Sequence, residues 1–103
     1  MSDAIRFIRA HAFDGINVAD VLRQVPMSRR AFDAGFREAF GRRPHEEIVH
    51  TRLQRVRELL VHTDLPLFAI AGRSGFKHVE YMSVVFKRKV GIPPSTYRER
   101  HRR

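Results

Sequence analysis

Residues 28–40, SRRAFDAGFREAF, carry the side chains whose types and spacing best suit contact with a nucleic acid. At about 100° per residue, the three phenylalanines of this segment share one face of a helix, and Gly35 joins them as a packing residue. Arg30, on the opposite face and near the start, could donate two hydrogen bonds to a guanine edge. The remaining residues of that outer face are Arg29, Asp33, Ala34 and Arg37.

Asp33 has two interpretations. Its carboxylate could accept a hydrogen bond from a cytosine amino group. It also lies four residues from both Arg29 and Arg37, which is the spacing of an ordinary set of surface ion pairs. We favour the ion-pair interpretation, because phosphates repel an acidic side chain unless an arginine neutralises it.

Residues 78–90 repeat this layout with different side chains. Val79 and Val84 could pack on thymine methyl groups, Ser83 could bond a base or a phosphate, and Glu80 could accept from cytosine. The alternative is a solvated helix face with apolar exposure by chance. We favour DNA contact, because two exposed valines on one face are costly without a partner. Over both segments, the residues predicted to reach phosphates are Ser28, Arg29, Arg37, His78 and Lys87.

The elements that must position these residues are helices. Apolar residues recur every three or four positions along the chain, which predicts an all-α fold of about seven helices. Residues 18–40 and 67–91 each combine a short helix, a turn and a capped helix, so they predict two helix-turn-helix units. A long helix over 44–62 would link them. The predicted segments are 1–43, 44–62 and 63–103, with recognition helices at about 28–40 and 78–90.

Charge and composition restrict the partner. Lys and Arg number 20 against 11 Asp and Glu, a net charge of +9, so a polyanionic partner is expected: nucleic acid or an anionic membrane surface. The membrane surface is the weaker alternative, because each apolar stripe has a partner helix to bury it. The absence of cysteine indicates a cytoplasmic protein, and no signal peptide or membrane span is evident.

Catalysis is not expected. HEEIVH at 45–50 resembles the zinc-protease motif H-E-x-x-H, but its second histidine comes five residues after the first instead of four. That extra residue turns the second ring off the ligand face. We therefore predict no enzyme activity, no metal and no cofactor.

The stretch IAGRSGFKHVEYMSVVFKRKVGIPPSTYR at 70–98 resembles the C-terminal signature of AraC/XylS-type bacterial transcription regulators. The skeleton is I-A-x-x-x-G-F, then Y-[FM]-x-x-x-F-K-[RK], then G-x-x-P-x-x-Y-R. Residues at those places are Ile70, Ala71, Gly75, Phe76, Tyr81, Met82, Phe86, Lys87, Gly91, Pro94, Tyr97 and Arg98. A narrower similarity, to xylose-operon regulators, rests on INVADVLRQVPMSRRAF and on the Val-Val-Phe-Lys of 84–87.

The resemblance implies sequence-specific binding of double-stranded operator DNA, with two recognition helices in successive major grooves. Its groove positions are Arg30, Asp33, Ala34, Val79, Glu80, Ser83 and Val84. Many relatives carry arginine at the places of Ala34 and Val84, so guanine reading there is in question. The resemblance also implies control of sugar genes, xylose among them, an N-terminal sugar-sensing domain, and RNA polymerase as a further partner. The alternative from another class is a basic helical protein–protein interaction module without sequence-specific DNA binding.

Overall fold

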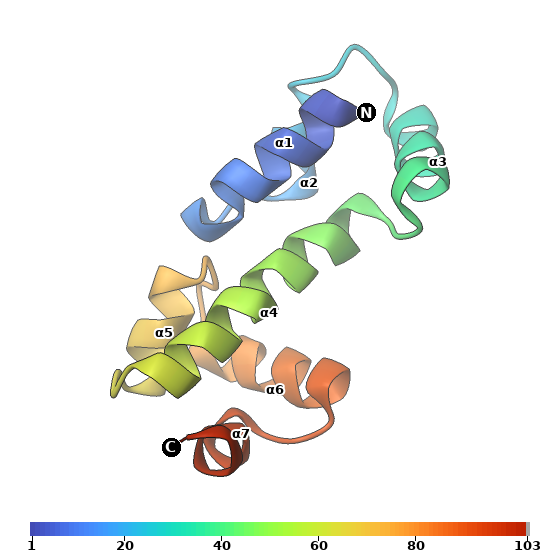
Figure 1. Ribbon diagram of the computed structural model, residues 1–103. Helices are drawn as coiled ribbons and strands as arrows, with labels where there is room; N and C mark the ends of the chain where they lie inside the picture. Colours follow the sequence, from blue (N-terminus) through green and yellow to red (C-terminus); the bar gives the residue numbers. More distant parts are fainter. Residues whose placement is uncertain (103) are drawn as a thin grey trace. The chain divides into compact units, whose positions relative to one another are not determined.

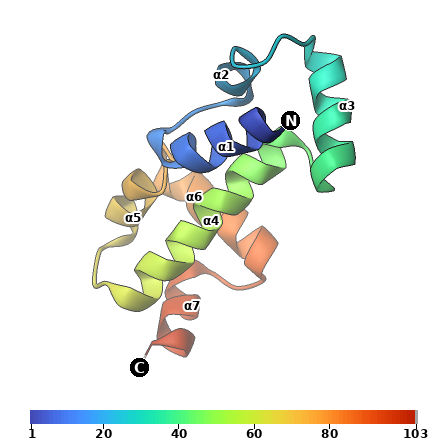
Figure 2. The same ribbon diagram turned by 45° about the horizontal axis from the view of Figure 1, so that its top comes forward.

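The computed structural model describes residues 1–102, and every regular element in that range is a helix. Arg103, the last residue of the predicted segment 63–103, lies outside the described residues. The prediction of an all-α fold with seven helices is confirmed (Figures 1 and 2). In chain order the elements are α1 (Ser2–His11), the 3-10 turn η1 (Ala12–Asp14), α2 (Val18–Leu22), α3 (Arg29–Phe40), α4 (Pro44–His62), α5 (Leu67–Arg73), α6 (Val79–Val90) and α7 (Pro94–His101).

The chain forms two compact units, and each has its own set of helices. The first unit contains residues 1–51 and the second begins at Arg52, so the division falls inside α4. The three-segment partition at residues 43 and 62 stays a prediction.

The core of the first unit joins α1, α2, α3 and the beginning of α4. Phe32 and Phe36 of α3 are fully buried there, and their rings meet edge to face with centroids 5.7 Å apart. These two rings fix which side of α3 faces inward, because burying them removes a large apolar area from water. The buried members of this cluster are Ala4, Ile5, Ile8, Val18, Val21, Phe32, Phe36 and Ile48.

The helix before α3 is shorter than its apolar pattern suggests. The spacing predicts a helix over 18–25, whereas α2 ends at Leu22. The backbone N–H groups of Gln24 and Val25 instead donate to carbonyls three residues back. Pro26 is the physical reason, because proline disfavours the helical conformation in the residue before it.

Helices α3 and α6 have the same length and end alike. Each residue of α3 has a counterpart 50 positions later in α6, from Arg29 and Val79 to Phe40 and Val90. Each helix ends at a glycine with positive φ, 77° at Gly41 and 100° at Gly91, whose N–H donates to a carbonyl four residues back. An L-residue is strained in that conformation, so both glycines are needed for the backbone turn.

In the second unit, α7 is held against the end of α4. The guanidinium of Arg98 donates through Nε to the carbonyl of Leu60 at 3.0 Å, and through Nη2 to Thr63 at 3.1 Å and Leu65 at 2.8 Å. Leu60 lies in the last turn of α4, and Thr63 and Leu65 follow the helix, so these carbonyls have no partner within α4. One arginine therefore caps α4 from a residue far along the chain.

The turn before α6 packs against a buried arginine, Arg52. The guanidinium of Arg52 lies 5.8 Å from the ring centroid of Phe76, which is itself buried in that turn. Burial lowers the pKa of Arg52 below its usual value, and the interaction with Tyr81 acts in the opposite direction. Phe76, three residues before α6, is thus part of the core of the second unit. Its buried apolar residues are Leu53, Val56, Leu60, Ile70, Ala71, Phe76, Met82, Val85 and Phe86.

Candidate nucleic-acid interface

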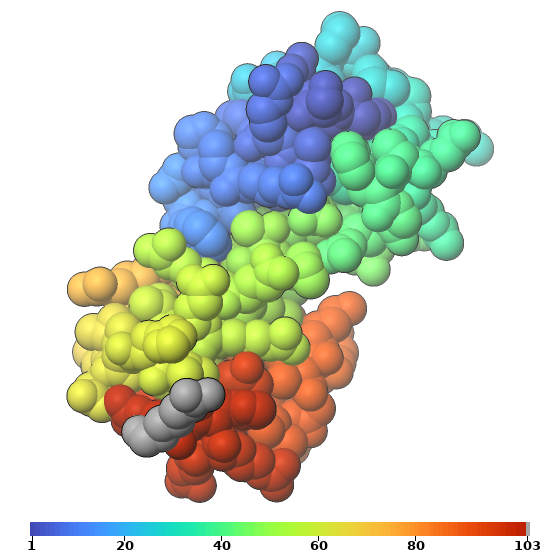
Figure 3. All heavy atoms as spheres, viewed as in Figure 1, coloured from blue at the N-terminus to red at the C-terminus, as the bar shows by residue number. Residues whose placement is uncertain are grey.

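The outer face of α3 is a narrow strip of exposed side chains. Arg30, Ala34 and Arg37 are all exposed, and helical geometry places them within about 60° of one another. The space-filling view has α3 and the turn before it, coloured cyan to green, on the surface of the first unit (Figure 3). The strip can therefore offer two guanidinium groups to one partner, with the small Ala34 leaving room between them.

Asp33 differs from its neighbours on this strip. It is half-buried, at the edge of the strip where α3 turns toward its phenylalanines. Within residues 1–102, no ion pair joins Asp33 to Arg29 or Arg37. The favoured set of surface ion pairs is therefore not formed, and the carboxylate is left with hydrogen-bonding capacity. Contact with a cytosine amino group remains a prediction.

The N-terminus of α3 is closed by a side chain. Ser28 is the N-cap, and its Oγ accepts a hydrogen bond from the backbone N–H of Ala31 at 3.2 Å. Its hydroxyl hydrogen stays free to donate, so a phosphate contact is compatible with capping. Arg29, the first residue of the helix, is also exposed.

The outer face of α6 carries fewer charged side chains than that of α3. Val84 is 60% exposed, and Glu80 and Lys87 are exposed beside it. Val79 and Ser83 are less exposed than these residues. Both are half-buried, because their side of the helix borders the buried Phe86. On α6, Glu80, Val84 and Lys87 are therefore exposed to a partner, whereas Val79 and Ser83 lie at the edge of the core.

The N-terminus of α6 has no side-chain cap. His78 is the N-cap and is exposed, but its side chain makes no capping hydrogen bond. The first N–H groups of a helix have no intrahelical acceptor, and the helix dipole makes that end attractive to anions. A phosphate is a suitable acceptor for this helix end.

Three exposed residues near these faces have no predicted contact with DNA. Tyr81 is 46% exposed, with its ring centroid 6.1 Å from that of Phe76. Arg43 and His45 are exposed just after α3 and were assigned no role. The arginine pair that follows the glycine at the end of α3 was the available signal for Arg43.

Other kinds of site find little support in the described chain. Across residues 1–102, no group of three or more His, Asp or Glu side chains could hold a metal ion. None of the helices in that range combines the length and the apolar character needed to cross a membrane.

Comparisons with known proteins agree with this geometry. Residues 21–100 match the family described as "Helix-turn-helix domain". The chain is 34% identical over 96 residues to the xylose operon regulatory protein of Escherichia coli (strain K12). The aligned residues make up 93% of this chain but only 24% of that relative. The chain therefore spans about a quarter of the length of this curated relative.

The fold also resembles those of solved transcription regulators, including the two that follow. The structure described as the xylose-binding transcription activator xylR is 33% identical with a TM-score of 0.78, and covers 97% of this chain and 26% of that one. The DNA-binding domain of AdpA, a global transcriptional factor solved in complex with a target DNA, is 27% identical with a TM-score of 0.90. The match covers 96% of this chain and 89% of the AdpA domain.

Proposed function

This chain belongs to the AraC-type helix-turn-helix domains of transcription regulators, and from that premise we propose that α3 and α6 read operator DNA. Each helix would enter a major groove, and the two grooves would be successive ones on the same duplex. The strip of Arg30, Ala34 and Arg37 carries this proposal, because two exposed cations lie directly opposite a fully buried core face.

The proposed roles follow from side-chain chemistry. Arg30 reads a guanine edge, and Asp33 or Glu80 accepts from cytosine. Val84 and Val79 contact thymine methyl groups, with Val84 contributing more because it is better exposed. The remaining groove positions are Ala34 and Ser83, and the proposed phosphate contacts are Ser28, Arg29, Arg37, His78 and Lys87.

The proposed setting of the whole protein rests on its relatives. The names of the xylose operon regulatory protein and of the transcriptional activator RhaR, which is 36% identical over 80 residues, support a transcription regulator, and we propose that it acts in the cytoplasm. We propose that it controls sugar genes, with xylose as the first candidate effector. An N-terminal sugar-sensing domain and RNA polymerase are the partners that this role would require.

A random pool of duplexes provides the main test. The wild-type chain should enrich a motif with two half-elements about one helical turn apart. Arg30→Ala should weaken operator binding by about 1–3 kcal/mol and relax specificity at one base pair, whereas Arg37→Ala should weaken binding to all sequences similarly. Operator binding by Arg30→Ala at wild-type strength would remove its assigned role.

A protein–protein interaction module is the second candidate. Phe68 on α5 is 71% exposed, which is the observation that favours a protein partner. This alternative requires that no duplex is enriched over random DNA and that affinity for duplex responds little to salt.

A further inference from the structure

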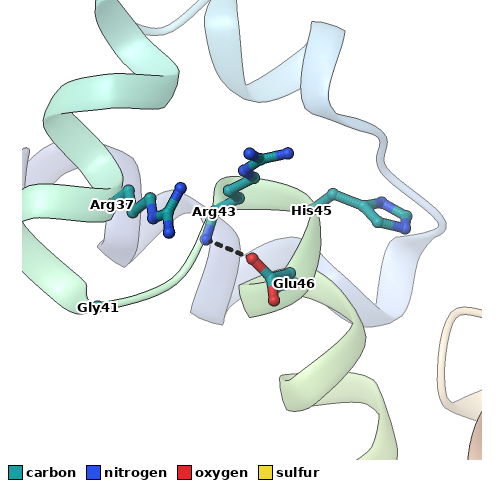
Figure 4. A pocket seen from close by; sticks show the side chains of 5 residues that line it. All are labelled: Arg37, Gly41, Arg43, His45 and Glu46. Atoms are coloured by element: carbon teal, nitrogen blue, oxygen red, sulfur yellow. Dashed lines mark hydrogen bonds between the residues drawn. The ribbon is translucent and has the colours of Figure 1, made fainter. Parts of the chain in front are cut away.

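A basic pocket lies where α3 ends and α4 begins. It has a volume of about 500 Å³ and is lined by Arg37, Gly41, Arg43, His45 and Glu46 (Figure 4). The side chain of Arg37 extends from α3 toward the backbone of Arg43, and the ring of His45 points away from Arg37 (Figure 4). The pocket thus brings one residue predicted to contact phosphates next to two that had no role.

The two arginines of the Arg42-Arg43 pair have different surroundings. Nε of Arg42 lies 3.5 Å from Oε1 of the buried Glu47, so its charge is compensated within the protein. Arg43 is exposed, and no acidic side chain within residues 1–102 pairs with its guanidinium or with that of Arg37. Two arginines that form no ion pair within residues 1–102 therefore line one hollow.

Glu46 places a carboxylate on the wall of this hollow. Its Oε1 accepts a hydrogen bond from the backbone N–H of Arg43 at 2.9 Å, which caps the beginning of α4. The first N–H groups of a long helix point outward at the same place, and the helix dipole adds positive potential there. The position therefore suits an anion despite the carboxylate on its wall.

We propose that this pocket seats one phosphodiester group of the operator backbone, held by Arg37 and Arg43. This inference rests on the proposed function and adds Arg43 to the phosphate contacts. Arg37 follows Arg30 by seven residues and lies on the same strip of α3, so a duplex read by Arg30 brings its backbone close to the pocket. The planar guanidinium fork matches phosphate oxygens, which supports a phosphate over other anions.

The second unit provides an internal comparison. Fifty positions later, Lys87 takes the place of Arg37, Gly91 that of Gly41, and Pro93 that of Arg43. The backbone turn is the same, but the second cation is missing. The pocket chemistry therefore belongs to the first unit and does not follow from the fold alone.

The test compares Arg43→Gln with Arg9→Gln, which removes an equal charge from the exposed face of α1. Affinity for operator and for random duplex is measured by fluorescence anisotropy over a range of salt concentrations. Arg43→Gln should weaken binding to both duplexes roughly five- to tenfold near 0.1 M salt and lower the salt slope by about 0.9. Arg43→Lys should restore the slope, and circular dichroism checks that each variant is folded.

Single methylphosphonate substitutions in the operator identify the phosphate. In the wild-type protein, one neutralised position beside the α3 half-element should weaken binding, and Arg43→Gln should reduce that sensitivity, because only Arg37 would still contact the phosphate. If Arg43→Gln and Arg9→Gln change duplex affinity and its salt slope equally, while wild type still selects its operator, the phosphate contact of the pocket is wrong and the proposed function stands. Loss of all selective duplex binding by wild type would overturn the proposed function as well.

A free anion is the other source of the same chemistry. Inorganic phosphate without DNA, followed through the backbone amide resonances of residues 41–46, distinguishes the two sources. Shifts that vanish in Arg43→Gln, together with no position-specific effect of methylphosphonates, would assign the pocket to free phosphate and overturn the duplex contact.

Discussion

Helices α3 and α6 share one backbone design and present different chemistry. Their bounds, their terminal glycines and one buried phenylalanine, Phe36 in α3 and Phe86 in α6, correspond at a spacing of 50 residues. On the outer faces, Arg30 corresponds to Glu80, and Ala34 corresponds to Val84. The buried side therefore maintains the helix in place, while the exposed side is free to differ without affecting the packing.

The two helices also differ at their beginnings. Ser28 caps α3 with its hydroxyl, whereas His78 leaves the first turn of α6 without a side-chain cap. Side-chain cations are thus the main source of positive potential on α3. On α6, the open helix end contributes more and apolar contact replaces the guanidinium fork.

The largest expected effect tests whether the two cores are equivalent. Phe36 and Phe86 are counterparts and both are fully buried. Phe36→Ala and Phe86→Ala should each lower the free energy of unfolding by about 3–5 kcal/mol, because each leaves a cavity. Urea unfolding followed by circular dichroism measures both. A cost below about 1.5 kcal/mol for either variant, the scale of volume-conserving changes, would show that the two cores differ.

Arg98 is where the two units differ most in packing. Its counterpart is Ile48, a buried member of the first core, whereas Arg98 donates to three carbonyls around the end of α4. Arg98→Ala should cost about 2–3 kcal/mol, because hydrogen bonds from charged groups are strong and the carbonyls of Leu60 and Leu65 lose this donor, while Thr63 keeps Arg102.

The readout for Arg98→Ala is tyrosine fluorescence, since both tyrosines, Tyr81 and Tyr97, lie in the second unit and the chain has no tryptophan. Arg102→Ala is the control. Its exposed guanidinium pairs with Asp64 and Thr63, and such surface contacts contribute about 0–1 kcal/mol. An equal loss from both variants would contradict the capping role of Arg98.

Glu80→Gln tests the contrast in charge between the outer faces. Removing the carboxylate should strengthen binding to random duplex by about 1 kcal/mol, because a repulsion with phosphates is lost. Operator binding should instead weaken if Glu80 accepts from cytosine. Anisotropy titrations with both duplexes separate the outcomes, and an equal gain for operator and random DNA would exclude base reading by Glu80.

The smallest effect concerns Gly35, whose counterpart is the buried Val85. A Cβ on Gly35 would lie 2.7 Å from the terminal methyl of Met1, which can move because it ends a flexible side chain. Gly35→Ala should therefore stabilise the protein by about 0.5 kcal/mol through better helix propensity. Thermal unfolding measures this change.

Gly41→Ala is the matched contrast for Gly35→Ala. A Cβ at Gly41 would meet nothing within 4 Å, but φ is 77°. Strain should therefore cost about 1 kcal/mol without any steric clash. Stabilisation by Gly41→Ala would contradict the need for glycine at the end of α3.

Much of the fold followed from local signals in the sequence. Ser28 and Gly41 delimit α3, and Pro44 begins α4, because capping, positive φ and the missing N–H of proline act within a few residues. The periodicity of the phenylalanines also identified the buried side of α3 and therefore its exposed side. The roles assigned to the exposed residues stay predictions.

What the sequence alone determined, except for the end of α2, is where the helices begin, where they end and which side they bury, since those properties depend mainly on neighbours along the chain. Only the tertiary structure decided that Asp33 lacks its arginine partners, that Arg42 is compensated while Arg43 is open, and that Arg98 caps α4. Helical spacing fixes the angle of a side chain around its own axis. It does not fix what approaches from another element, and that approach decides which charges remain available to a partner.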